Sequence, residues 1–140
     1  MRDQAKAFHD SVPCAYHRAV AEQSFQVLDA ATAQTVEGVC DAIVPGSARV
    51  RPAVYIDALL ARMDEGTRGA AIAAFYTVGE DVAASAGTPD FFWVRALAIE
   101  AFYSDFVAPG VDAAGAWEEI DFNSPLATRL AKDWSYLGIS

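Results

Sequence analysis

The chain has 140 residues, of which 54% are hydrophobic, and its net charge is −9 from 10 basic and 19 acidic residues. This size and apolar content favour one domain with one core and exclude a disordered chain. The acidic balance argues against nucleic-acid and anionic-membrane surfaces, since both need concentrated Lys and Arg.

The apolar residues favour helices over strands or membrane spans. Alanine is abundant, β-branched residues are scattered, and no Asn-Gly or Asp-Gly hairpin turn occurs. No apolar run approaches roughly 18 residues, so we expect no membrane insertion. We predict an all-α fold: a single-domain orthogonal bundle of about five helices over residues 1–140, with an irregular C-terminal segment.

The chain is expected to open with a polar, flexible arm over residues 1–12, which lacks the apolar stretch of a secretory signal. Pro13 interrupts any early helix, and a helical pattern follows over 14–25. Two cysteines, Cys14 and Cys40, make no disulfide framework. We therefore expect reduced thiols and a cytoplasmic location.

The clearest helix signal covers residues 29–44. Asp29 is a good N-cap, because a short carboxylate accepts from the free N–H groups of a first turn. Pro45 and Gly46 are predicted to end the helix near Val44. Apolar residues recur on one face at steps of three and four, at Val36, Val39, Cys40, Ile43 and Val44.

Two further helices are predicted between residues 52 and 87. Pro52 suits a first helical position, and its helix is expected to end near Gly66. Thr67 is the predicted cap of the next helix, which Gly87 terminates. The first of the two has an apolar stripe at helical spacing, formed by Tyr55, Ile56, Leu59, Leu60 and Met63.

The most aromatic helix is predicted after residues 88–90, with Asp90 or Thr88 as its cap, and is expected to end at Pro109-Gly110. Its apolar residues lie on more than one face, which indicates deep burial or contact with a partner. A loop with a short turn should follow, then a last helix from residue 123 or 124. The apolar tail is expected to pack down.

Three segments of the chain carry a family resemblance. They are Leu28-Asp29 with a helix that ends in Ile43-Val44-Pro45, Val54-Tyr55-Ile56-Asp57 with Leu59-Leu60, and Phe102-Tyr103-Ser104-Asp105 with Gly115-x-Trp117 and Ile120. Together they resemble the gluconate 2-dehydrogenase subunit 3 family. Its members are small helical subunits that accompany a large flavoprotein of the glucose–methanol–choline oxidoreductase type.

The resemblance implies a non-catalytic accessory subunit that binds and stabilises a flavin-dependent sugar or alcohol oxidoreductase in a heteromer. It places FAD and the catalytic base on the flavoprotein large subunit, so it implies no cofactor on this chain. Two features depart from the family: the common twin-arginine export signal is absent, and residues 122–140 replace its glycine-rich C-terminal stretch. They imply a cytoplasmic version in a sugar- or natural-product-oxidising pathway.

Candidate catalytic and metal-binding residues are few. His9, Cys14 and His17 lie close together with Asp10 nearby, but their spacing matches no standard metal motif, so we predict no metal. Glu100 is a weak catalytic candidate, because it is the only carboxylate embedded in an aromatic helix. A solvated face or a helix cap is the commoner role of such carboxylates.

Other catalytic signals are missing. Cys40 lies on an apolar helix face, where core packing is favoured over nucleophilic chemistry. No dinucleotide fingerprint, phosphate loop or nucleophile elbow occurs.

The large rings exceed what one small core is expected to hold. Trp and Tyr are enriched at the centres of protein interfaces. Phe91 and Phe102 are assigned to the core. We predict that a partner interface uses some of Phe92, Trp93, Tyr103, Trp117, Trp134 and Tyr136.

Two alternatives remain open. One is a free-standing small helical enzyme, a cyclase or isomerase of a natural-product pathway, with Glu100 in a pocket between helices. The other is a homo-oligomeric structural protein. The residues themselves name no substrate.

Overall fold

The computed structural model describes residues 24–122 and 135–139. Within these ranges the chain forms five α-helices, two 3-10 helices and no strand, which confirms the all-α prediction. The elements are α2 (Ala30–Ile43), η1 (Ser47–Val50), α3 (Pro52–Leu60), α4 (Glu65–Glu80), α5 (Pro89–Tyr103), α6 (Ala116–Glu119) and η2 (Ser135–Leu137). The arm over 1–12, most of the helix predicted over 14–25 and the predicted last helix lie outside the described ranges.

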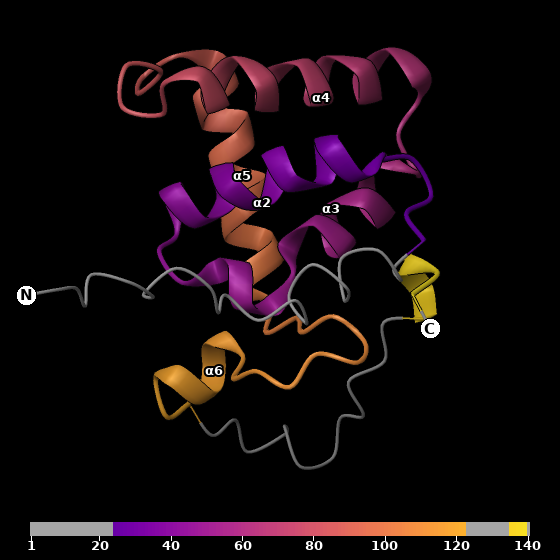
Figure 1. Ribbon diagram of the computed structural model, residues 1–140, viewed down its shortest axis with the longest axis vertical. Helices are drawn as coiled ribbons and strands as arrows, with labels where there is room; N and C mark the ends of the chain where they lie inside the picture. The colour runs from indigo at the N-terminus through magenta and orange to yellow at the C-terminus, as the bar shows by residue number, and fades with distance from the viewer. Residues whose placement is uncertain (1–23, 123–134, 140) are drawn as a thin grey trace, which may run out of the picture.

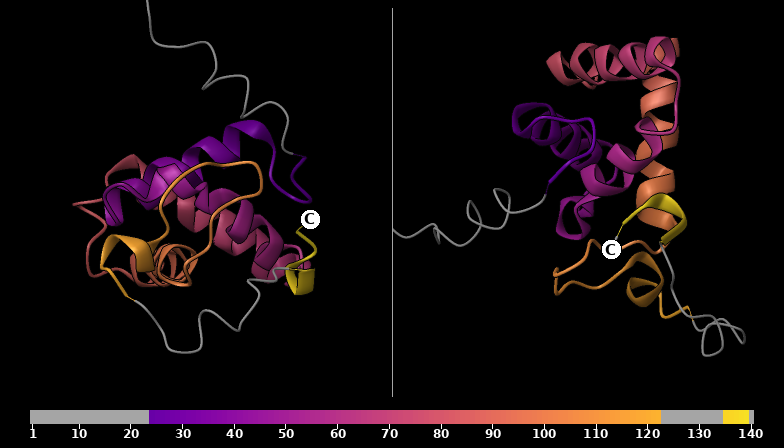
Figure 2. Two further views of the ribbon diagram at one scale, coloured as in Figure 1. Left: turned by 90° about the horizontal axis from the view of Figure 1, so that it is seen from below. Right: turned by 90° about the vertical axis from the view of Figure 1, so that its right-hand side faces the viewer.

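Helix α5 crosses the other long helices and holds the bundle together. Figure 1 shows α5 passing behind α2 and α3, with α4 lying across its upper end, and the right-hand view of Figure 2 agrees. It packs against α2, α3 and α4, while α2 also packs against α3 and α4. This crossed arrangement is the predicted orthogonal bundle.

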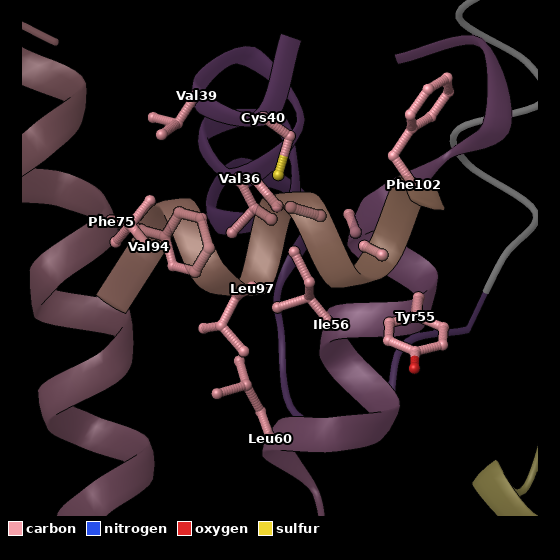
Figure 3. Packing of buried hydrophobic residues seen from close by; sticks show 14 of the residues in the cluster. Val36, Val39, Cys40, Tyr55, Ile56, Leu60, Phe75, Val94, Leu97 and Phe102 are labelled. Carbon is pink, nitrogen blue, oxygen red and sulfur yellow. The ribbon is translucent and has the colours of Figure 1, made fainter. Parts of the chain in front are cut away.

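The core lies where these four helices meet. Figure 3 shows Val36 and Cys40 of α2, Ile56 of α3, Phe75 of α4 and Val94 of α5 pointing towards one another. Each of these side chains is fully buried or within 1% of it. The three- and four-residue spacing of apolar residues along α2 therefore places them on the buried face, as the sequence predicts.

Short polar side chains begin three of the helices. Asp29, Asp64 and Thr88 each accept a hydrogen bond from the backbone N–H three residues further on. Asp29 and Thr88 were both expected as caps. The prediction for α4 was wrong, because Asp64 is its cap and Thr67 supplies the donor N–H.

Three helices end earlier than the sequence suggests. Helix α3 ends at Leu60 instead of near Gly66, and α4 ends at Glu80 instead of at Gly87. Helix α5 ends at Tyr103 and does not reach Pro109-Gly110.

A polar side chain marks each of these early ends. The Leu60 carbonyl at the end of α3 accepts from the Met63 N–H in a tight turn at 3.1 Å and from the Arg68 guanidinium at 3.2 Å. After α4, Asp81 is extended and its carboxylate accepts from the Ala84 N–H, so a turn replaces the helix. After α5, Asp105 has a φ of +63°, which no α-helix tolerates.

The C-terminal tail packs against α3 as expected. Leu137 is buried, and the Arg62 guanidinium donates to its carbonyl oxygen at 2.9 Å and to that of Tyr136. In the part of the chain described, no helix has the length and apolar character needed to cross a membrane.

Candidate functional site

An open pocket of about 380 Å³ lies between the end of α2, the C-terminal half of α5 and helix α6. Its volume falls within the range of small-molecule sites, roughly 300 to 1,000 Å³. Its charged lining residues are Arg95 and Glu119. The rest of the wall is formed by Ile43, Val44, Pro45, Ile99, Phe102, Tyr103, Ala116 and Ile120.

The wall from α2 is set by the turn after that helix. The Asp41 carboxylate accepts from the N–H groups of Gly46 and Ala48, at 2.9 and 3.1 Å. Gly46 has a φ of +86°, a left-handed conformation that glycine adopts without a steric penalty. The predicted stop at Pro45-Gly46 therefore fixes residues 43–45 on one side of the pocket.

The wall from α6 depends on a buried carboxylate. Asp105 is only 4% exposed and accepts from the Trp117 N–H at 3.0 Å. A Cβ atom on Gly115 would lie 2.3 Å from Oδ1 of Asp105, so this close approach requires glycine. Trp117 Nε1 also donates to the Tyr103 carbonyl oxygen at 3.3 Å. These contacts hold α6 against the end of α5 (Figure 1).

Arg49 connects the two walls. Its guanidinium donates to the carbonyl oxygens of Gly46 and Ala114 and forms an ion pair with Glu119. It also lies over the Phe102 ring, 4.9 Å from the ring centroid, in a cation–π arrangement. The Glu119 carboxylate of the pocket is therefore already paired.

Arg95 differs from the other arginines of the described ranges. Arg49, Arg51, Arg62 and Arg68 each donate to a carboxylate or to backbone carbonyl oxygens. Arg95 is exposed, lines the pocket, and forms no hydrogen bond or ion pair with any residue of 24–122 or 135–139. Its charge is available to a ligand.

An exposed apolar surface adjoins the pocket, and we call Tyr103, Trp117, Ile120 and Phe122 the α5–α6 patch. Tyr103 is 53% exposed, Ile120 65% and Phe122 50%. The Trp117 and Phe122 rings meet edge to face with their centroids 5.3 Å apart. Tyr103 and Ile120 belong both to the patch and to the pocket wall, so the two features form one face.

The rings predicted to meet a partner are distributed over three places. Tyr103 and Trp117 come together in the patch, as just described. Phe92 and Trp93 lie near the start of α5, with Phe92 59% exposed and Trp93 partly buried against the core. Tyr136 is exposed on η2.

Trp134 lies outside the described residues. Of the rings assigned to the core, Phe102 is buried and Phe91 packs against the core while partly exposed. Sequence reasoning missed Ile120 and Phe122 as members of the exposed face, because the aromatic residues it weighed left out Phe122 and it weighed no aliphatic residue.

Glu100 does not line the pocket. It is exposed on α5 and accepts from the Tyr55 hydroxyl at 3.0 Å. Burial, with the Glu100 hydrogen bond and charge in addition, raises the pKa of Tyr55 to about 12. The pair links α3 to α5.

Cys40 is a core residue, as its position on the apolar face predicts. It is fully buried, and burial, reinforced by the charges of Glu37 and Asp41, raises the pKa of its thiol to about 12. The thiol is therefore protonated at neutral pH and is no nucleophile.

Metal-binding groups do not gather in the part of the chain that the structure describes. No three His, Cys, Asp or Glu side chains of that part lie close enough to hold an ion. His9, Asp10, Cys14 and His17 lie outside it.

Asp57 has a structural role that the sequence analysis did not foresee. It is 3% exposed, and its carboxylate accepts from the N–H groups of Gln26, Val27 and Leu28, at 2.7, 2.9 and 2.8 Å. These bonds fix the stretch that leads into α2. In the sequence, the position of this carboxylate within the apolar stripe of α3 was the signal that could have indicated a buried role.

The segments that carry the family resemblance thus have different positions. Residues 43–45, 102–103 and 120 meet at the pocket, whereas Asp57 anchors the chain before α2. Comparison with models of protein families, with curated proteins and with solved structures finds no match to this chain.

Proposed function

We propose that this chain is a small non-catalytic accessory subunit that binds a larger protein through the α5–α6 patch. The observation that carries the proposal is the exposure of Tyr103 and Ile120 beside a pocket, together with that of Phe122, whose ring contacts Trp117. Contiguous exposed apolar side chains are characteristic of protein interfaces, and isolated ones are ordinary. An aromatic cluster next to a concavity also matches the anchors that dominate binding energy.

The rigidity of the segment beneath the patch supports the same proposal. Asp105 and Arg49 fix α6 and the chain just before it with hydrogen bonds, and Gly115 allows the close approach of the Asp105 carboxylate. A preorganised surface loses less conformational entropy on binding than a mobile loop does. More of the free energy gained by burying the aromatic rings therefore contributes to the affinity for the partner.

The proposed class of partner follows from the family resemblance alone. It is a cytoplasmic flavin-dependent oxidoreductase of the glucose–methanol–choline type that acts on a sugar or alcohol. In this proposal the partner carries the FAD and the catalytic base, and this chain keeps the partner folded and active.

Co-expression with a glucose–methanol–choline-type flavoprotein, sought first among the neighbouring reading frames, tests the proposal. The two proteins should elute together in size-exclusion chromatography, and the flavoprotein should lose solubility or activity without this chain. The double variant Tyr103→Glu/Phe122→Glu should elute separately, because two buried carboxylates at an interface are strongly unfavourable.

Phe92→Glu is the matched control, since Phe92 is 59% exposed on the same helix but lies outside the patch. It should still co-elute, and circular dichroism should show the native helix content in all variants. A flavoprotein that is active alone and elutes apart from the wild-type chain would refute the proposed function.

A further inference from the structure

The pocket combines an apolar wall with a single uncommitted cation. Ile99 and Phe102 on α5, together with Val44 at the end of α2, provide hydrocarbon surface. Arg95 stands on the same helix as Ile99, four residues earlier, so both side chains emerge on one side of α5. A ligand that fills this pocket meets hydrocarbon and a guanidinium at once.

The other charge in the pocket is already neutralised. Glu119 is ion-paired with Arg49, whose remaining donors hold the carbonyl oxygens of Gly46 and Ala114. Glu119 is thus occupied with the fold, and it does not compete for Arg95 within the described residues. The Arg95 guanidinium therefore attracts an anion, while the pairing with Arg49 offsets the repulsion from the Glu119 carboxylate.

We propose that this pocket binds a small apolar molecule that carries one carboxylate, such as a medium-chain or arylalkyl carboxylic acid. The hydrocarbon portion packs against Val44, Ile99 and Phe102, and the carboxylate pairs with Arg95. A guanidinium fits a carboxylate through two parallel hydrogen bonds, which selects carboxylates over alcohols and amides. This site belongs to the free chain, and it does not depend on the proposed partner.

Titration of the purified chain with octanoate and with 1-octanol tests the site, with two-dimensional NMR as the readout. Both ligands should shift the amide signals of residues 43–45, 99–103 and 116–120. Arg95→Met should weaken octanoate binding about fivefold, the contribution of a partly exposed ion pair, and leave octanol binding unchanged. Arg95→Lys should retain part of the octanoate affinity, because lysine keeps the positive charge but lacks the two parallel N–H donors of a guanidinium.

A second pair of variants locates the site without relying on Arg95. Ile120→Asp places a carboxylate at the pocket wall and should lower octanoate binding. Phe92→Asp makes the same change at an equally exposed apolar position outside the pocket and should not. Both positions are on the surface, so both variants should fold.

Three results would overturn the proposal. The first is octanoate binding that Arg95→Met does not weaken. The second is signal changes spread over the surface without saturation. The third is a capped Leu-Glu dipeptide that binds more tightly than octanoate, which would assign the pocket to a protein side chain. Co-elution with the flavoprotein is a separate measurement, so the two proposals fail independently.

Discussion

The α2–α5 bundle and the segment over residues 104–122 are held in place by different interactions. The bundle depends on apolar side chains such as Val36, Ile56 and Phe75, which are completely buried between helices. The segment buries fewer apolar side chains, namely Phe106, Ala108 and Ala116, and adds polar contacts to the backbone, chiefly those of Asp105 and Arg49. The pocket forms where the two parts meet. Apolar burial thus chiefly holds the bundle, and burial together with specific hydrogen bonds holds the candidate site.

Aspartate carboxylates that accept backbone N–H groups also occur outside that segment. Within residues 24–122 and 135–139, aspartate carboxylates accept backbone N–H groups at six positions, which are Asp29, Asp41, Asp57, Asp64, Asp81 and Asp105. Each one caps a helix or fixes a turn or connection between elements. Part of the acidic excess of this chain therefore serves local chain geometry, and surface charge is only one of its roles.

The largest effect is expected from Asp57→Ala, which tests whether buried carboxylates support the scaffold as well as the loops. Three backbone N–H groups, one buried and two partly buried, would lose their acceptor, so the free energy of unfolding should fall by about 3 to 5 kcal/mol. Urea denaturation monitored by circular dichroism measures this change.

Asp90→Ala is the control for this variant, because Asp90 is exposed in the first turn of α5. It should cost less than about 1 kcal/mol. Equal losses of unfolding free energy in the two variants would show that the three hydrogen bonds of Asp57 stabilise the fold no more than an exposed carboxylate does.

Gly115→Ala should have the next largest effect, and it acts on the 104–122 segment alone. The new Cβ would lie 2.3 Å from Asp105 Oδ1, so the carboxylate must move and give up its bond to the Trp117 N–H. We expect a loss of about 2 to 3 kcal/mol in unfolding free energy, from one broken hydrogen bond and the displacement of a buried carboxylate.

The change should also be local. Amide signals of residues 102–120 should shift or broaden, while those of the α2–α4 core stay in place. Gly69→Ala, where no atom lies within 4 Å of the new Cβ, is the matched control and should not destabilise α4. Uniform changes across the bundle would contradict the division into two parts.

A smaller, pH-dependent effect is expected from Tyr55, which joins α3 to α5 in the scaffold. Its pKa is raised from 10.0 to about 12, first by burial and then by Glu100. Above pH 10 the unfolded chain releases this proton while the folded chain keeps it, so stability is lost as the pH rises from 10 towards 12. At pH 11 the loss should be about 1 kcal/mol.

Urea denaturation at pH 8 and pH 11 measures this loss against Tyr55→Phe, which cannot ionise at that position. The wild-type chain should lose about 1 kcal/mol more than the variant between the two conditions. An identical loss in both proteins would mean that other groups, and not Tyr55, govern alkaline stability.

The sequence predicts the helices of the bundle better than it predicts the 104–122 segment and its pocket. The starts of α2, α3 and α5 were predicted, because Asp29, Pro52 and Thr88 act on their own first turns. The core face of α2 was predicted from its periodicity. Early helix ends were missed, because the residues beyond Leu60 and Tyr103 still fit a helical pattern.

The pocket could not be predicted from local patterns. The bond between Asp105 and Trp117 spans 12 residues, and that between Arg49 and Ala114 spans 65. No periodicity encodes such contacts, so nothing in the sequence signalled that residues 43–45 would face α6. The family resemblance marked several residues that meet there, without indicating that they meet.

The smallest effect is a gain in stability, and it is expected from Gly38→Ala on the exposed face of α2. No atom lies within 4 Å of the new Cβ, so the change removes only the conformational cost of glycine inside a helix. We expect a gain of about 0.5 to 1 kcal/mol in unfolding free energy by urea denaturation. Gly79→Ala makes the same substitution in α4, where the Cβ would lie 3.2 Å from Val39 Cγ2 of the packed face. That contact should cancel the gain. Equal stabilisation of both variants would mean that α4 and α2 are not packed closely enough for the new methyl group to press on Val39.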